Sequence, residues 1–170
     1  MAKLSQRQVV AKVMSHRDAT GAATGPDWDT GITATGLQRQ YFAQVNGGEI
    51  RASVEKVYDG GSTFPEVLPA PIEVGDLTVT RHFDPDTDGP LLEYYRPRVG
   101  KARFDVNIYT LDADNQPIGQ TRQYQNVLLV SITDPDGDSS AGGPATFALT
   151  FAVSTVTTSS PIGSTGTAVF

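Results

Sequence analysis

Closely spaced aspartates are the residues whose arrangement in this chain comes nearest to metal chemistry. Asp84, Asp86 and Asp88, followed by Gly89, match the opening of an EF-hand calcium loop. Such a loop needs a bidentate Glu as its last ligand, and this chain has Tyr95 at that position. The acidic clusters that begin at positions 112 and 134 fail the same count. Because Asp also accepts hydrogen bonds from its own turn backbone, we predict acidic turns between strands and no metal site.

Groups for acid–base, nucleophilic or phosphate chemistry lack the partners that these reactions need. The chain has no cysteine and two histidines, His16 and His82. No nucleophile is paired with His82 in the sequence, so we interpret it as a structural or surface residue. Gly21 and Gly25 lead into Pro26 rather than into Lys-Ser/Thr, which excludes a phosphate-binding loop. We therefore predict no catalytic residues, no cofactor and no enzyme activity.

Length and charge narrow the remaining classes. The 170 residues suit one domain with a sizeable core. No apolar run approaches the ~18 residues of a membrane span, and the start MAKLSQRQVV lacks the apolar segment of a secretory signal, so we expect synthesis in the cytoplasm and no membrane partner. The formal net charge of -6 disfavours tight DNA binding, which needs Lys and Arg on the phosphates. The same charge would repel DNA, or simply keep the protein soluble.

Most of the chain predicts strands. The runs 37–45 and 49–58 flank an Asn-Gly-Gly turn, which is a strong hairpin signal. In the second run Ile50, Ala52 and Val54 alternate with polar residues, so we expect one face of that strand to be buried. Further strands are expected in IEVGDLTVTRHF, KARFDVNIYTLD, GQTRQY followed by NVLLVSIT, and ATFALTFAV.

One short helix is expected among these strands. Pro90 suits a first helical turn and Pro97 limits extension, which leaves about two turns. Leu91, Leu92 and Tyr95 would then share one face, at helical spacing, against the sheet.

The whole pattern predicts a mainly β fold: an antiparallel β-sandwich or small barrel with one short flanking helix and extended loops and arms. We expect a single domain over residues 1–170. It would consist of an N-terminal arm or loop (1–36), in which Gln6–Met14 is interpreted as a short strand, a β core (37–153) and a C-terminal arm (154–170).

The segment Asp59–Pro71 is predicted to be an irregular, projecting loop. It combines two glycines and three prolines with the apolar residues Phe64, Val67 and Leu68. Apolar side chains on a proline-stiffened projection suit docking on a partner; the alternative is that the loop folds over its own core. These three side chains are candidate inter-subunit contacts.

The two arms supply further candidate contacts. Trp28 lies in a Gly-rich segment and would plug a groove in its own or a neighbouring subunit. The tail 154–170 is rich in Ser, Thr and Gly, and Ile162 and Phe170 are among its few apolar residues. These would anchor the tail if it draped over a neighbour, whereas a plain disordered end is the alternative.

Several runs, taken in order, resemble a phage tail-tube protein. They are NGGEIRASVEKVYDGG, IEVGDLTVTRHFD, PLLEYYRPRVG, RFDVNIYTLD with its PIG turn, YQNVLLVSITDPDGD and ATFALTFAV. The resemblance covers residues 46–153 and is nearest to the major tail protein of long, non-contractile tailed phages. Arg81 after the LTVT strand and the segment LLVSITDPD are among its features. Tubes of contractile tails share much of this layout.

The resemblance implies hexameric rings that stack into a hollow tube in the phage tail of the virion. The tube would conduct genomic DNA without binding it tightly, surround a tape-measure protein, and meet tail-tip or terminator proteins. The loop 59–71 would reach an adjacent ring, and the two arms would lie between subunits. The alternative is a carbohydrate- or protein-binding β-sandwich, similar to an adhesin module, in which Trp28, Tyr94 or Tyr95 forms a stacking platform.

Overall fold

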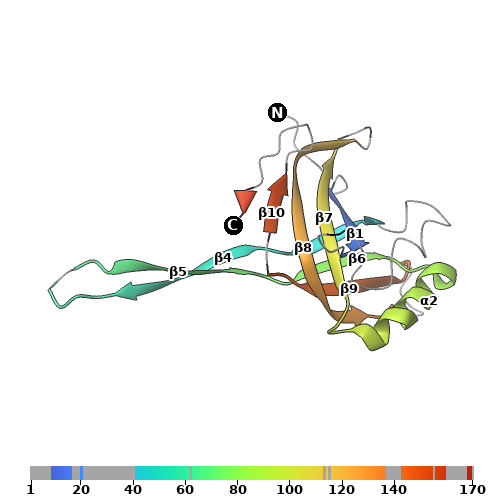
Figure 1. The fold of residues 1–170 in the computed structure, drawn as a ribbon, viewed down its shortest axis with the longest axis horizontal. Helices are drawn as coiled ribbons and strands as arrows, with labels where there is room; N and C mark the ends of the chain where they lie inside the picture. Colours follow the sequence, from blue (N-terminus) through green and yellow to red (C-terminus); the bar gives the residue numbers. More distant parts are fainter. Residues whose placement is uncertain are drawn as a thin grey trace.

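The computed structural model describes residues 9–16, 20, 41–61, 63–112, 114, 116–136, 143–154, 156–159 and 168–169. These ranges contain strands, one α-helix and one 3-10 helix (Figure 1). In chain order the elements are β1 (Val9–Ser15), β2 (Tyr41–Phe42), β3 (Gln44–Gly47), β4 (Ile50–Val57), β5 (Glu66–Val74), β6 (Leu77–His82), α2 (Pro85–Tyr95), η3 (Arg96–Arg98), β7 (Arg103–Leu111), β8 (Pro117–Thr133), β9 (Thr146–Ala152), β10 (Val156–Ser159) and β11 (Ala168–Val169).

One antiparallel sheet forms the body of the molecule and closes on itself. Its strands are hydrogen-bonded in the order β2-β1-β7-β8-β9-β6-β3. In the chain, Ala43 alone separates β2 from β3, so consecutive residues hold the two ends of the sheet together. Contacts of β1 with β3 and of β2 with β6 complete the closure. The predicted mainly β, antiparallel fold is confirmed, in the form of a small closed barrel.

Strand β8 ties two parts of the sheet together. One edge pairs with β7, while the other pairs with β10 near its middle and with β9 near its end. Between these two partners lies Asn126, whose φ of 53° is left-handed, a conformation that Asn tolerates better than most residues. The N–H of Asn126 donates to the Asp105 carboxylate at 2.9 Å, and the same oxygen lies 2.8 Å from Nδ1 of His16. This contact fixes the bend in β8 and gives His16 a structural role.

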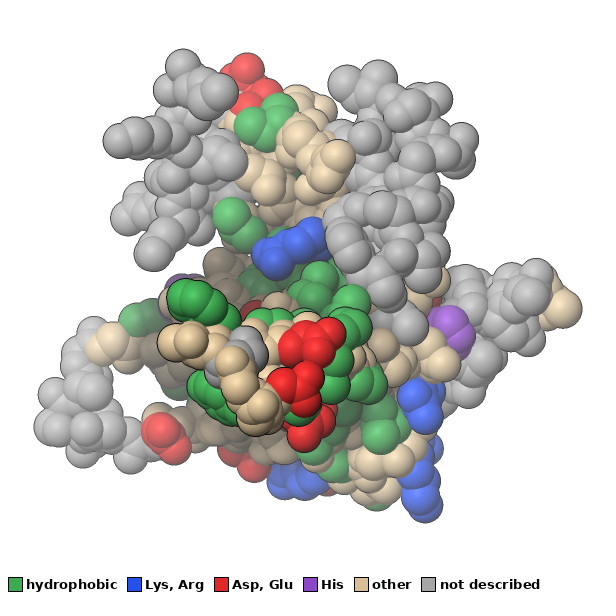
Figure 2. Space-filling view, turned by 90° about the vertical axis from the view of Figure 1, so that its left-hand side faces the viewer, with side chains coloured by type: hydrophobic (Ala, Val, Ile, Leu, Met, Phe, Trp, Pro, Cys, Tyr) green, Lys and Arg blue, Asp and Glu red, His purple; other side chains and the backbone are tan. Residues whose placement is uncertain are grey.

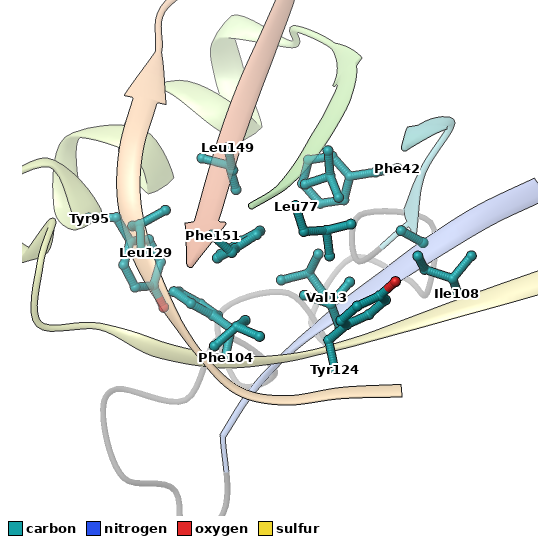
Figure 3. Packing of buried hydrophobic residues seen from close by; sticks show 14 of the residues in the cluster. Val13, Phe42, Leu77, Tyr95, Phe104, Ile108, Tyr124, Leu129, Leu149 and Phe151 are labelled. Carbon is teal, nitrogen blue, oxygen red and sulfur yellow. The ribbon is translucent and has the colours of Figure 1, made fainter. Parts of the chain in front are cut away.

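Inward-pointing side chains of the strands fill the body (Figure 3). The Phe42 and Phe147 rings meet edge to face with centroids 5.9 Å apart, and Phe104 meets Phe151 at 5.5 Å. The alternating residues that the sequence predicts as core positions in β7 and β9 are buried: Phe104, Val106, Ile108, Phe147, Leu149 and Phe151. Burial of one face of each strand therefore follows from the period-two pattern.

Helix α2 begins at Pro85, earlier than predicted from Pro90, and has 11 residues rather than about two turns. The reason is the capping function of Asp84, whose side chain accepts a hydrogen bond from the N–H of Asp86 at 3.2 Å. A proline at the first helical position and acidic residues in the first turn then favour helix where we predicted an acidic turn. The predicted packing of the helix is confirmed, since Leu92 and Tyr95 are buried.

A buried ion pair fastens α2 to the sheet. Arg81 on β6 bonds to Asp88 on α2, and their side chains are only 12% and 4% exposed. The second oxygen of Asp88 accepts the N–H of Asp84 at 3.1 Å. The guanidinium of Arg81 also lies over the rings of Phe42 and Phe147, at 4.8 and 5.2 Å. Both charges thus have partners, as buried charges must.

The predicted hairpin at 46–48 is wrong. β3 pairs with β6, and β4 pairs with β5, so Gly47 and Gly48 mark a change of direction rather than a turn between partners. The run IEVGDLTVTRHF is likewise two strands, interrupted at Gly75 and Asp76. Strand propensity finds the strands, but it does not say which strand pairs with which.

The core sheet extends beyond the predicted limits of 37 and 153. β1 lies in the expected N-terminal arm and pairs along its whole length with β7. β10 lies in the expected C-terminal arm and pairs with β8. Both strands are held because β7 and β8 each present an edge that needs a hydrogen-bonding partner.

Candidate functional site

The hairpin β4–β5 projects far from the body (Figure 1). Within the described part of the chain these two strands pair with each other and with no third strand. An isolated two-stranded hairpin is marginally stable in water because it has no core of its own. The projection therefore needs another surface to pack against.

The register of the hairpin gives it two unlike faces. Residues opposite each other across the strands share a face, and successive residues alternate between faces. One face, named here the apolar face, carries Ile50, Ala52, Val54, Lys56, Val67, Pro69, Ile72 and Val74. The other, the polar face, carries Arg51, Ser53, Glu55, Val57, Glu66, Leu68 and Glu73. Lys56 is the single charged residue among the eight positions of the apolar face.

The apolar face is largely open to solvent. Its exposed fractions are 44% for Ile50, 55% for Val54, 55% for Val67 and 54% for Ile72. Val74, at the base, packs against the core of the body instead. The apolar stripe thus starts at the core and continues outward along the hairpin without cover. Exposed apolar surface of this extent marks an interaction site.

The tip of the hairpin is also apolar. Tyr58 is 68% exposed and Phe64 is 81% exposed. Large aromatic side chains contribute strongly to protein interfaces because each buries a large area at a small cost in conformational entropy. The tip is therefore a second candidate contact surface, at the end of the projection.

The charged residues of the polar face are mainly acidic. Three glutamates lie on it, at 55, 66 and 73, against one arginine, Arg51. Arg51 lies opposite Glu73 and forms an ion pair with Glu49. Figure 2 views the molecule from the left-hand side of Figure 1 and shows acidic side chains gathered on one side of the projection. Like charges on one face produce a negative potential over it.

The base of the hairpin is held to the body by a small set of hydrogen bonds. The N–H of Gly48 donates to the carbonyl of Asp76 at 3.1 Å, and the N–H of Gly75 donates to the carbonyl of Glu49 at 2.8 Å. The hydroxyl of Tyr124 on β8, a fully buried residue, donates to the carbonyl of Gly48 at 3.0 Å. The hairpin is thus joined to the body by defined contacts and not by a loose linker.

Three predicted contact residues lie on this hairpin, at different places. Phe64 is at the tip, Val67 is on the apolar face, and Leu68, 40% exposed, is on the polar face. The prediction that Asp59–Pro71 is irregular is wrong from Glu66 onward, where β5 begins. Pro69 and Pro71 are tolerated within β5 because β5 is an edge strand with one side unpaired. Trp28, Ile162 and Phe170 lie outside the described residues.

Residues that the sequence analysis placed in the fold, and not at an interface, complete the apolar face. We expected Ile50, Ala52 and Val54 to be buried, whereas all three are exposed in the single chain. The signal that identifies them is joint: an alternating run at 50–54 beside a second apolar run at 67–74, with proline in the partner strand. Proline in β5 disfavours pairing of its free edge with a third strand, so the ribbon stays two-stranded and outside the larger sheet.

The other candidate sites have structural explanations. Asp84 caps α2 and Asp88 pairs with Arg81, while Asp112 accepts the N–H groups of Asp114 and Gln116, both at 2.9 Å. These acidic segments therefore act as a helix cap and a turn. His82 lies exposed at the end of β6.

The aromatic platform of the alternative function is not formed by the two tyrosines of α2. Tyr95 is 3% exposed and belongs to the core. Tyr94 is 36% exposed, but the guanidinium of Arg98 occupies one face of its ring, 3.7 Å from the centroid.

Among the residues that the structure describes, no helix is long and apolar enough to cross a membrane.

Comparison of the sequence with protein families and with curated proteins finds no match. Solved structures with a similar fold do exist. A chain of the sheath–tube complex of the extracellular contractile injection system PVC, in its extended state, superposes with a TM-score of 0.66 at 14% identity, over 93% of this chain and 92% of that chain. A chain of the six-fold symmetrised baseplate of the anti-feeding prophage AFP gives 0.67 at 13% identity, over 96% and 99%. A chain of the tube-terminating cap of the same prophage gives 0.66 at 13% identity, over 94% and 93%.

These similarities extend over almost the whole of each chain, and at such identities they concern the fold. The chain shares its fold with these chains of sheath–tube, cap and baseplate assemblies. PVC is a contractile injection system, so the similarity is not specific to the non-contractile phage tails that the sequence resembles.

Proposed function

We propose that this protein is the repeating structural subunit of a tube, in a phage tail or a phage-like injection particle. The observation that carries the proposal is the exposed apolar face of β4–β5. A two-stranded ribbon with one uncovered apolar face is stable when that face packs on another chain. A second copy of this protein is the partner that a repeating subunit always has beside it.

A contact between two different surfaces of identical subunits closes a ring or continues as a helix. The hairpin and the body are two such different surfaces. Each subunit would give its hairpin to one neighbour and accept another hairpin on its body, so modest contacts add up along the assembly. Stacked hexameric rings are the proposed arrangement, and the six-fold symmetry of the AFP baseplate that contains a similarly folded chain supports this number.

The proposed tube would conduct genomic DNA. DNA carries one charge per ~1.7 Å of helix axis, so a wall with the acidic balance of this chain would let it pass without tight binding. A tape-measure protein inside the tube and terminator or tail-tip proteins at its ends are the other proposed partners. The terminator or cap and the baseplate of the similar particles support the end partners. The protein would be made in the host cytoplasm and function in the virion.

Electron microscopy of a matched pair of proteins tests the proposal. The first protein is the full chain, purified and concentrated, alone and seeded with tail-tip complexes. In the second, residues 53–71 are replaced by Asn-Gly, which joins the paired residues Ala52 and Ile72 through a two-residue hairpin turn. This change removes most of the hairpin, leaving three residues of each strand, and keeps the body and the base intact.

The expected result is rings or hollow tubes for the full chain and dispersed monomers for the shortened one. Circular dichroism checks that the shortened chain keeps its β structure. A full chain that never assembles, even when seeded, would overturn the proposal. Tubes formed equally well by the shortened chain would overturn the role of the hairpin.

A further inference from the structure

The junction between the body and the hairpin contains two adjacent glycines with left-handed backbone conformations. Gly47 has φ 86° and Gly48 has φ 67°. A Cβ at Gly47 would lie 1.9 Å from the carbonyl oxygen of Asp76, so a side chain does not fit there. These glycines allow the chain to change direction where it leaves the closed sheet.

Two glycines by themselves permit a change of direction without selecting one angle. The hydrogen bonds from Gly48 to Asp76 and from Gly75 to Glu49 tie the outgoing and returning connections to each other. They do not tie the junction to the strands on the far side of the body. That link comes from Tyr124, on the central strand β8.

Tyr124 lies where it can set the angle between the hairpin and the body. Its ring is fully buried, and its hydroxyl reaches the carbonyl of Gly48, a buried residue, at 3.0 Å. A Cβ at Gly48 would lie 2.5 Å from that hydroxyl oxygen, so the junction and the tyrosine are packed directly against each other. Its backbone neighbours on β7 and β10 hold Tyr124 itself in register, at Val106 and Val156.

We infer that Tyr124 is a positioning residue that fixes the direction in which the hairpin leaves the body. The inference rests on the proposed function, in which the hairpin must reach a second copy of this chain. A hairpin already held at the correct angle pays less ordering entropy when it docks, so the Tyr124 hydroxyl would favour assembly without touching the partner.

Distances measured in the dilute, unassembled protein test the inference. Because the chain has no cysteine, Thr63→Cys at the hairpin tip and Ser131→Cys on β8 accept spin labels selectively. Pulsed electron paramagnetic resonance then gives the distribution of distances between tip and body. We expect one narrow distribution for the otherwise wild-type chain. For Tyr124→Phe the population outside that peak should rise about tenfold, since losing one hydrogen bond and leaving its buried acceptor unpaired is worth roughly a factor of ten.

Two further variants control the experiment. Tyr95→Phe removes a hydroxyl from another buried tyrosine, on α2, and should leave the distance distribution unchanged. Gly48→Ala approaches the same contact from the other side, because its Cβ would displace the Tyr124 hydroxyl, and should broaden the distribution. This variant also serves if Tyr124→Phe folds poorly.

A wild-type distribution in both Tyr124→Phe and Gly48→Ala would overturn the inference. Equal broadening in Tyr95→Phe would also overturn it, since the effect would then reflect general loss of stability. The proposed function fails separately: if the distances change as expected but the wild-type chain forms no tubes, Tyr124 positions the hairpin and the tube assignment is wrong.

Discussion

Strands β7 and β4 have the same alternating sequence pattern but differ in burial. In β7 the apolar residues Phe104, Val106 and Ile108 are buried within the closed sheet. In β4 the apolar residues Ile50 and Val54 are about half exposed, on a ribbon of two strands. Alternation therefore shows that a face is made to be covered. It does not show whether the cover comes from the same chain or from another one.

The largest effect expected from this comparison is on the stability of the single chain. Phe151→Ala removes a fully buried ring from the core and should lower the free energy of unfolding by about 4 kcal/mol. Phe64→Ala makes the same chemical change at the exposed tip and should change it by less than about 0.5 kcal/mol. Urea denaturation of dilute protein, followed by circular dichroism, measures both. Equal losses would mean that the hairpin tip is part of the folded core.

Ion pairs sharpen the same contrast with a smaller effect. Asp88→Ala leaves the buried guanidinium of Arg81 without its carboxylate and should cost about 3 kcal/mol of unfolding free energy. Glu49→Ala breaks the exposed pair with Arg51 at the base of the hairpin and should cost between about 0 and 1 kcal/mol. The same denaturation experiment compares them. A large loss for Glu49→Ala would show that the junction carries stability that its exposure does not suggest.

The smallest effect on the single chain should accompany a large effect on assembly. The double variant Val54→Thr with Ile72→Thr keeps β-branched residues on the apolar face but adds two hydroxyls. Because both positions are exposed, the free energy of unfolding should change by less than about 0.5 kcal/mol. Tubes should be lost, because the hydroxyls would be buried without partners on docking. Sedimentation velocity, at concentrations where the wild-type chain assembles, measures the loss of assembly.

The matched control is on the other face of the same ribbon. Ser53→Thr with Glu73→Gln should leave both stability and assembly close to wild type. If the polar-face pair abolished assembly and the apolar-face pair did not, the docking face would be the wrong one.

The strands that form the closed sheet were predictable because local pattern and final burial agree there. Phe147, Leu149 and Phe151 alternate in the sequence and point into the core, as do the apolar residues of β7. The helix was found but started too late, because Asp84 was interpreted as part of an acidic turn. A cap and a turn use the same Asp hydrogen bonds to the backbone, and only the chain that follows distinguishes them.

The candidate site was predictable in part. Phe64, Val67 and Leu68 were selected because apolar side chains on a projection are unusual, and all three are exposed. Ile50 and Val54 were assigned to the core, since their strand carries the signature of a half-buried sheet. The partner strand decides the outcome, and strand pairing depends on contacts far apart in the sequence.

The sequence by itself determined the mainly β class, most strand positions, the core residues of β7 and β9, and the acidic balance of the chain. These follow from local propensity and from a period of two, which act over a few residues. The tertiary structure decided that the segment 41–47 closes the sheet, that β4 and β5 leave it as a separate ribbon, and that Tyr124 contacts Gly48. Those features depend on pairing and packing between residues that are distant in the chain. The free energy of such pairing is shared among many contacts, so no short sequence pattern predicts the partners.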